Sequence, residues 1–460
     1  MSADKSNIVT SLRNARTGRR PVRPLFLIAG AVAVLAAAPV SFPAPAEARA
    51  APAALGQSVD DFYAARQDRL LWFQAGQPTI AAQQLVSLIA TADHDGLDPD
   101  KYRAKALAKA IRNAVEGDSG DVRKADRMLS KAFVDYARDL RNAPAAGMQF
   151  ADPRLRSGPP SPHMLLAMAA TAPSLAEFMR SMGWMNPNYA PLRRALVAGH
   201  YRTERQRDLI RINLQRARVL PAAFPRYVIV NAAAQRLEMY DGNRLTDSMK
   251  VVVGKQKDNN RTPMLASFLS FASLNPYWNV PADLAAERIA PNVVKLGLGY
   301  LEDKGYQVLS DWSQNPSIVD PATIDWQAVA DGRIEVRVRQ LPGPENGLGD
   351  IKFTFPNPHG VYLHDTPDKQ LLNEETRLFS GGCIRLEDAS RFGKWLYGRT
   401  LRATSNAPDI EVPLERPVPI FVTYMTVVPS GSSIAFLDDV YGWDAARLAE
   451  IGPVGRVAAR

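Results

Sequence analysis

The sequence predicts an α+β protein in which a helical region, residues 51–222, precedes a β-rich region, residues 223–430. From residue 58 to about residue 220, apolar residues recur every three or four positions, which is the period of one helix face. After Phe224-Pro225 the period changes to two, which is typical of strands with one buried face. A mixed segment, about 279–345, interrupts the strands and indicates an insertion.

The composition is that of an ordinary globular protein. The chain has 460 residues, 46% hydrophobic and 22% charged, which exceeds one core and predicts two or three domains. Its formal charge of +9 is concentrated at the N-terminus, because residues 1–50 hold seven basic and two acidic residues and the rest carries +4. No basic block with interleaved aromatic residues remains, so no nucleic-acid partner is expected.

Residues 1–50 have the three parts of an export signal. A basic stretch ends at Arg23, an apolar run extends from Leu25 to Ala38, and small residues follow around Ala46-Glu47-Ala48. The run of 14 apolar residues is short for a membrane span, which needs about 20. A cleaved signal peptide is therefore favoured, and an uncleaved N-terminal anchor is the alternative.

Helical patterns follow an Ala/Pro-rich linker at 51–57. Ser58 is expected to cap a first run that ends at Gly76, and Thr79 a second run closed by Gly96. A third run places its apolar residues between 128 and 140 on one stripe. The last helix, about 204–219, is rich in arginine, which is typical of a solvated face.

Strands are expected from residue 227 onward, with a hairpin turn at Asp241-Gly242. The runs with strand character are 227–230, 235–240, 249–253, 268–272, 351–355, 361–364 and 420–424. Within the insertion a helix is expected near 282–295, and the whole insertion is a candidate lid. Residues 431–460 are interpreted as a closing segment.

Cys383, the only cysteine of the chain, is the main candidate for chemistry. It lies in Ser380-Gly381-Gly382-Cys383-Ile384-Arg385, and an unpaired thiol in an exported protein calls for an explanation. The two glycines leave room for another molecule to approach the sulfur. An inert, buried cysteine is the alternative. Because the flanking residues offer no core partner, we interpret the chain as a cysteine acyl-transfer enzyme.

His364, 19 positions before Cys383, is the candidate base for this thiol. Three other histidines lie in the helical half, and His359 lies in a turn. Either the Asp365 side chain or a backbone carbonyl is expected to orient the imidazole.

Main-chain N–H groups of Gly382 and Cys383 would suit an oxyanion hole. Arg385 either binds a substrate carboxylate or pairs with an acid such as Glu387 or Asp388. The residues alone leave these two roles for Arg385 open.

His364-Asp365-Thr366 followed by Ser380 to Arg385 resembles the motif of the L,D-transpeptidases, whose catalytic domain is called YkuD. The similarity extends to Gly254 with Thr262-Pro263 and to the stretches 275–281 and 342–349. Together these features resemble the long, YcbB-like branch of Gram-negative bacteria, over about residues 58–445. Only the histidine and cysteine motif is specific.

The resemblance implies an α-helical scaffold domain at 51–222 and a catalytic domain at 223–430 with a capping subdomain at about 279–345. It also implies a periplasmic enzyme that needs neither metal nor cofactor and is acylated by carbapenems. Its partners would be peptidoglycan tetrapeptide stems, as donor and acceptor.

In that mechanism Cys383 attacks the third residue of a stem, a diaminopimelate, and releases D-alanine. The amine of a neighbouring stem then resolves the thioester as a 3→3 crosslink, with His364 as base and then acid. Arg385, Tyr362, Ser380 and Trp278 are the candidate substrate-binding residues.

Two features depart from the family. Gly381 stands where many relatives have histidine, and the short interval 189–203 leaves no room for a peptidoglycan-binding module. Three alternatives stay open: hydrolysis of the same stems as an L,D-carboxypeptidase or endopeptidase, attachment of an outer-membrane protein to peptidoglycan, and a non-catalytic wall-binding scaffold. Papain-like hydrolases place cysteine before histidine, so the order here favours the transpeptidase.

Overall fold

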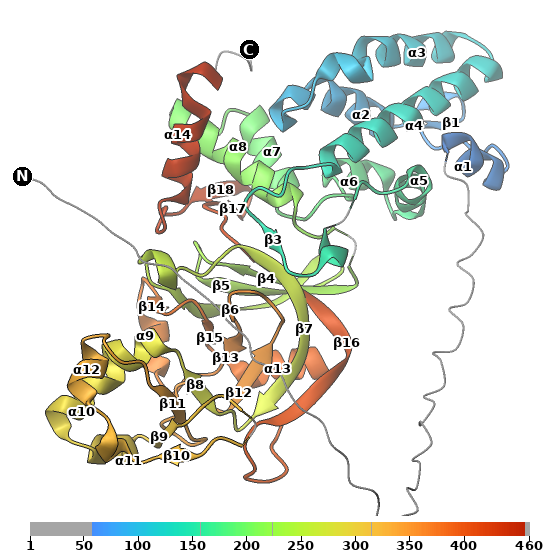
Figure 1. Ribbon diagram of the computed structural model, residues 1–460. Coiled ribbons are helices and arrows are strands. Elements are labelled where there is room, and N and C mark those ends of the chain that lie inside the picture. Colours follow the sequence, from blue (N-terminus) through green and yellow to red (C-terminus); the bar gives the residue numbers. More distant parts are fainter. Residues whose placement is uncertain (1–57, 157, 223, 314, 456–460) are drawn as a thin grey trace, which may run out of the picture. The chain divides into compact units, whose positions relative to one another are not determined.

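The computed structural model describes residues 58–156, 158–222, 224–313 and 315–455 (Figure 1). The expected export signal and the linker at 51–57 lie outside the described residues. No helix in the described ranges is long and apolar enough to cross a membrane.

Helices make up most of the N-terminal region, which shares one apolar core. They are α1 Val59–Ala65, α2 Ile80–Ala90, α3 Ala104–Glu116, α4 Ser119–Arg141, α5 Pro162–Thr171, α6 Leu175–Arg180, α7 Tyr189–Val197 and α8 Glu204–Arg218. As predicted, Ser58 caps α1: its hydroxyl accepts a hydrogen bond from the Asp61 N–H at 3.1 Å, and the Asp61 carboxylate accepts one from the Ser58 N–H at 3.0 Å.

The expected single run from Ser58 to Gly76 is wrong. Helix α1 ends at Ala65, and Gln67 and Asp68 adopt positive φ angles of 55° and 58°, which break the helix. A small hairpin of β1 (Phe73–Gln74) and β2 (Gln77–Pro78) follows. Its turn also needs positive φ, which Gly76 supplies at 73°.

The β-rich region is a sheet that closes on itself (Figure 1). Its order is β12-β13-β15-β6-β5-β4-β16-β7, and β7 pairs with β12 as well as with β16, which completes the ring. The strands are β4 Arg226–Asn231, β5 Arg236–Asp241, β6 Arg244–Gly254, β7 Leu265–Leu274, β12 Ile351–Thr354, β13 Leu363–His364, β15 Ile384–Leu386 and β16 Ile410–Thr423. Two short strands add to it, β3 Gln149–Phe150 on β7 and β14 Leu378–Ser380 on β6.

Between β7 and β12 the chain forms a second, four-stranded sheet with its own core. The strands are β8 Trp278–Val280, β9 Tyr306–Leu309, β10 Ile318–Val319 and β11 Arg337–Gln340, in the order β10-β9-β11-β8. The helices are α9 Ala282–Leu284, α10 Ala290–Leu296, α11 Gly299–Asp303 and α12 Trp326–Ala330. The helix expected near 282–295 is confirmed, with a π-helical turn at Ala285–Ile289.

After the ring the chain adds α14 (Trp443–Gly455) and a hairpin of β17 (Val427–Ser430) and β18 (Ser433–Phe436), while α13 (Ala389–Tyr397) lies between β15 and β16. The hairpin joins the apolar core of the helical region. Buried polar contacts strengthen this junction, because the Asn213 amide donates to Thr426 Oγ1 at 2.9 Å and Arg216 pairs with Asp444 at 2.5 Å. A helical region followed by a β-rich region confirms the predicted α+β class.

Candidate active site

Cys383 lies in the loop between β14 and β15, where its side chain is half-buried. Two hydroxyl groups hold this loop. Ser380 Oγ donates to the Cys383 carbonyl at 2.6 Å and accepts from the Gly382 N–H at 3.1 Å. From the other side, Thr262 Oγ1 donates to the Gly382 carbonyl at 2.8 Å and accepts from the Gly254 N–H at 2.9 Å. The position of the sulfur is therefore fixed by the fold.

Glycine is required at two places around this loop. Gly382 has a φ of 119°, which side chains rarely tolerate. A Cβ on Gly254 would lie 1.9 Å from the Asn260 carbonyl oxygen, so no side chain fits there. Gly381 differs, because a Cβ there would meet nothing closer than 3.6 Å.

Gly254→Ala is expected to lower the free energy of unfolding by at least about 2 kcal/mol, since the new methyl group overlaps main-chain atoms that cannot move away. The matched variant Gly381→Ala should change it by less than about 0.5 kcal/mol. Urea unfolding followed by circular dichroism measures both. Equal stabilities of the two variants would contradict the packing described for Gly254.

Strand register places four predicted site residues on one face of the sheet. β13 runs parallel to β15, with His364 opposite Arg385, and the Ile384 N–H donates to the Tyr362 carbonyl at 3.0 Å. The same register puts Tyr362 beside Cys383. Because side chains alternate along a strand, Tyr362, His364, Cys383 and Arg385 share a face. By this register His364 and Cys383 are diagonal neighbours across the two strands.

His364 is oriented as a neutral base. Its side chain is buried, and Nδ1 lies 2.5 Å from the main-chain oxygen of Asp365. A carbonyl only accepts hydrogen bonds, so Nδ1 carries the proton and Nε2 is left with a free lone pair. Burial, together with the charges of Arg385, Lys352 and Lys369, lowers the pKa of His364 to about 3.

The Asp365 carboxylate does not hold the imidazole. It pairs instead with Lys369 Nζ at 2.6 Å. Of the two orienting groups considered for His364, the structure therefore places the main-chain carbonyl at the ring.

Tyr362 lies next to the Cys383 sulfur, and Trp278 lies next to the Tyr362 hydroxyl. The thiol also lies 3.8 Å from the Gly360 carbonyl. Burial raises the pKa of Cys383, although the Tyr362 hydrogen bonds and the charge of Arg385 act in the opposite direction. The resting site therefore holds a neutral thiol and a neutral imidazole rather than an ion pair.

The rate of Cys383 alkylation by iodoacetamide is expected to rise at every step from pH 7 to pH 9. A raised thiol pKa leaves little thiolate at pH 7, and the thiolate fraction grows as the pH approaches that pKa. No inflection is expected near pH 6.5, the ordinary value of histidine, because the pKa of His364 is about 3. Stopped-time alkylation read by mass spectrometry measures this profile. A plateau from pH 6 upward would reveal a resting thiolate–imidazolium pair and contradict the description.

Arg385 pairs with an acid, but not with either of the two acids that the sequence indicated. Its Nη1 lies 2.8 Å from the Asp368 carboxylate and 3.4 Å from Thr366 Oγ1. Its Nε is buried and has no hydrogen-bond partner among the described residues. The guanidinium therefore combines a structural ion pair with one unused donor on the site's face.

The two expected oxyanion donors differ in their availability. The Gly382 N–H donates to Ser380 Oγ, whereas the Cys383 N–H makes no main-chain hydrogen bond within the described ranges. Ser380, a candidate for substrate binding, is buried and uses its hydroxyl on the loop itself.

The sequence reasoning missed several residues that shape the site. Lys352 lies opposite His364 on β12, and the Tyr441 hydroxyl donates to the Gly254 carbonyl at 2.7 Å. Asn346 donates to the Pro276 carbonyl at 2.9 Å, and Gly347 packs on the Trp278 ring, so the loop 342–349 positions that tryptophan. The glycine-rich composition of the loop was the available signal, but its partner could not be read from the chain.

The inserted segment contacts the nucleophile loop directly. A Cβ on Gly381 would lie 3.7 Å from Leu284, and the Lys257–Glu287 ion pair at 2.9 Å joins the segment to the loop after β6. Arg288 also approaches the Phe379 carbonyl at 3.4 Å. Together with Trp278, these contacts place the insertion beside the sulfur.

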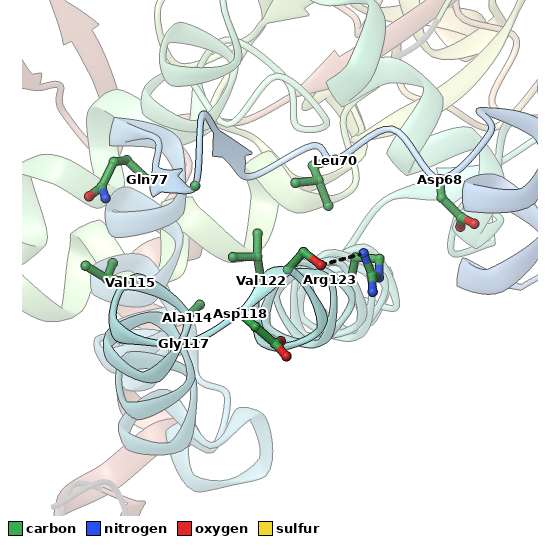
Figure 2. A pocket seen from close by; sticks show the side chains of 11 residues that line it. Asp68, Leu70, Gln77, Ala114, Val115, Gly117, Asp118, Val122 and Arg123 are labelled. Atoms are coloured by element: carbon green, nitrogen blue, oxygen red, sulfur yellow. Dashed lines mark hydrogen bonds between the residues drawn. The ribbon is translucent and has the colours of Figure 1, made fainter.

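A separate cavity of about 570 Å³ lies in the helical region, between the α3–α4 turn and the segment around Leu70 (Figure 2). Its walls combine apolar side chains such as Val122 with Asp68, Asp118 and Arg123. Neither histidine nor cysteine is among the residues that line it.

Two parts of the chain match known protein families. Residues 57–196 match the model of a scaffold domain, and residues 225–420 match that of the L,D-transpeptidase catalytic domain, YkuD. A curated relative from Haemophilus influenzae, named "Putative L,D-transpeptidase", is 29% identical over 405 residues, which cover 85% of this chain and 78% of the relative.

Two solved structures are also similar. An L,D-transpeptidase from Mycobacterium smegmatis is 14% identical, with a TM-score of 0.22, over 43% of this chain and 58% of its own. The Ldtfm–avibactam carbamoyl enzyme is 12% identical, with a TM-score of 0.22, over 44% and 51%. At TM-scores this low, neither supports a statement about this chain.

Proposed function

Because this chain belongs to the L,D-transpeptidase family, we propose that it forms 3→3 crosslinks between peptidoglycan stems through a thioester on Cys383. The observation that carries the proposal is the shared face of Cys383, His364 and Arg385, with a half-buried Cys383 and an imidazole whose Nε2 is free.

The first half of the reaction forms the thioester. His364 Nε2 takes the proton of the Cys383 thiol as the sulfur bonds to the carbonyl carbon of the third stem residue. The Cys383 N–H is available to the oxyanion. The peptide bond to D-alanine then breaks, and the imidazolium returns the proton to the leaving amine.

In the second half, the side-chain amine of an acceptor stem attacks the thioester carbonyl. His364 takes the proton that the amine loses, the C–S bond breaks, and the proton returns to sulfur. Each turn therefore exchanges one peptide bond for another and restores the free thiol. Arg385, held in place by its ion pair with Asp368, is proposed to attract a carboxylate of the donor stem through its charge, with Tyr362 and Trp278 nearby.

The proposal includes export to the periplasm by the segment 1–50, and acylation of Cys383 by carbapenems. Residues 279–345 would act as the capping subdomain, next to a scaffold domain at 51–222 and within a catalytic domain at 223–430.

Product masses test the proposal. Purified protein is incubated with disaccharide-tetrapeptide, and the products are read by mass spectrometry. A dimer lighter by one D-alanine is expected. Hydrolysed tripeptide as the sole product would identify a carboxypeptidase. If neither hydrolysed tripeptide nor crosslinked dimer forms, the assignment is overturned. Adding an outer-membrane lipoprotein as a competing acceptor distinguishes protein attachment.

A further inference from the structure

A hollow of about 220 Å³ opens on the inserted segment, at the end of its small sheet. The end of β8, the start of β11 and the loop between β9 and β10 enclose it. Val280, Pro281 and Val336 give it an apolar floor, and Trp312, half exposed, lines it from the loop. An exposed tryptophan beside an apolar floor presents a flat surface on which a ring can stack.

Three planar polar side chains surround this floor. Asn279, Glu335 and Arg337 line the hollow and are exposed. In the described ranges, none of the three makes a hydrogen bond or an ion pair, so their donors and acceptors are unused. Amide, carboxylate and guanidinium groups together offer both donors and acceptors in fixed planes, which suits vicinal hydroxyl groups.

The charges around the hollow balance. Arg337 and Glu335, of opposite charge, both line it, and hydrogen bonds from Ser313 and Ser310, with the charge of Arg337, keep the pKa of the neighbouring Asp311 below its usual range. A multiply charged peptide would gain little from such a balanced surface, whereas a neutral polyhydroxyl ligand meets no unpaired charge. The hollow is also smaller than the roughly 300–1,000 Å³ of pockets that enclose drug-sized ligands, so it matches a single ring.

The hollow lies on the segment that contacts the nucleophile loop. Asn279 follows Trp278, which lies next to the Tyr362 hydroxyl. Leu284, a little further along the same segment, lies 3.7 Å from the position that a Cβ on Gly381 would occupy. A ligand held here would lie close to the entrance of the site.

We propose that this hollow binds one N-acetylhexosamine ring of the glycan strand to which the stem peptide is attached, with Trp312 stacked on the sugar. This inference rests on the proposed function for the identity of the polymer. Through this hollow the chain would contact the glycan without a separate binding module, for which the interval between residues 189 and 203 leaves no room.

Binding of chitotetraose, a neutral N-acetylglucosamine tetramer, tests the site independently of the crosslinking reaction. Isothermal titration with the full protein carrying Cys383→Ala is expected to give a Kd in the millimolar range or below. Trp312→Ala should weaken binding about 10- to 30-fold, as truncation of an aromatic anchor does. Arg337→Ala should weaken it about fivefold. Leu296→Ala, which removes an exposed apolar side chain elsewhere on the same segment, should leave Kd unchanged.

Each outcome decides the proposal. No binding at 10 mM sugar, or equal Kd values for the Trp312→Ala and Leu296→Ala variants, would overturn it. Trp312-dependent binding of a sugar-free stem peptide in place of chitotetraose would also overturn it and identify a peptide site. Thermal melting of each variant shows that it is folded. Because the titration does not use Cys383, failure of crosslinking with intact sugar binding would remove the proposed function alone.

Discussion

Cys383→Ser is expected to lower kcat for crosslinking by about 10⁴-fold or more while leaving the fold unchanged. A serine hydroxyl fits the space of the thiol, and the loop is held by Ser380 and Thr262 rather than by the sulfur. The hydroxyl is far less acidic than a thiol, however, and its oxygen is a poorer nucleophile towards an amide. Initial rates of dimer formation from disaccharide-tetrapeptide measure the effect.

Thermal melting is the control for this variant, because a small shift in Tm shows that the lost rate is chemical. Crosslinking by Cys383→Ser within about tenfold of the parent rate would mean that another group carries the acyl chain. That result would support the alternative that Cys383 is an inert, packed side chain.

His364→Gln is expected to lower kcat/KM for acylation by about 10²- to 10⁴-fold. Glutamine can still donate to the Asp365 carbonyl, but it has no lone pair that accepts the thiol proton at neutral pH. Because the raised pKa of Cys383 leaves little spontaneous thiolate, the loss of the base cannot be made up at pH 7. Acylation of the variant should recover partly above pH 9, where the thiol ionises by itself.

His359→Gln is the matched control, since His359 lies in an exposed turn and its Nε2 faces Gln149 at 2.6 Å. That variant should retain the parent rate. Alkylation of Cys383 at pH 7 should also be slower in His364→Gln than in the parent. Equal alkylation and acylation rates in the parent and His364→Gln would remove His364 as the base.

The order of elements could be predicted because it depends on local periodicity. Helix α4 and strands β4 to β6 are long enough for the period of their apolar residues to be recognised in the sequence. Strands β8 to β11 have two to four residues each, too few for alternation to be recognised. The end of helix α1 was not predicted, because glutamine and aspartate do not by themselves indicate the positive φ angles that Gln67 and Asp68 adopt.

The candidate site was predictable to the level of residues but not of contacts. Two short motifs identified Cys383 and His364 as candidates, since both residue types are rare here and suit acyl transfer. What surrounds them depends in part on strand register, which brings Lys352 to His364 from another strand. The pairing of Arg385 with Asp368 and the hydrogen bond from the Gly382 N–H to Ser380 depend on the path of the loops, which spacing alone could not indicate.

The central claim is that the Cys383 sulfur carries the acyl group between two stems. Acid quenching of the protein a few milliseconds to seconds after mixing with disaccharide-tetrapeptide, followed by digestion and mass spectrometry, measures this directly. A disaccharide-tripeptide mass is expected on the peptide that contains Cys383, and it should disappear when an acceptor amine is added. Crosslinked product without any adduct on that peptide, or an adduct on another residue, would contradict it.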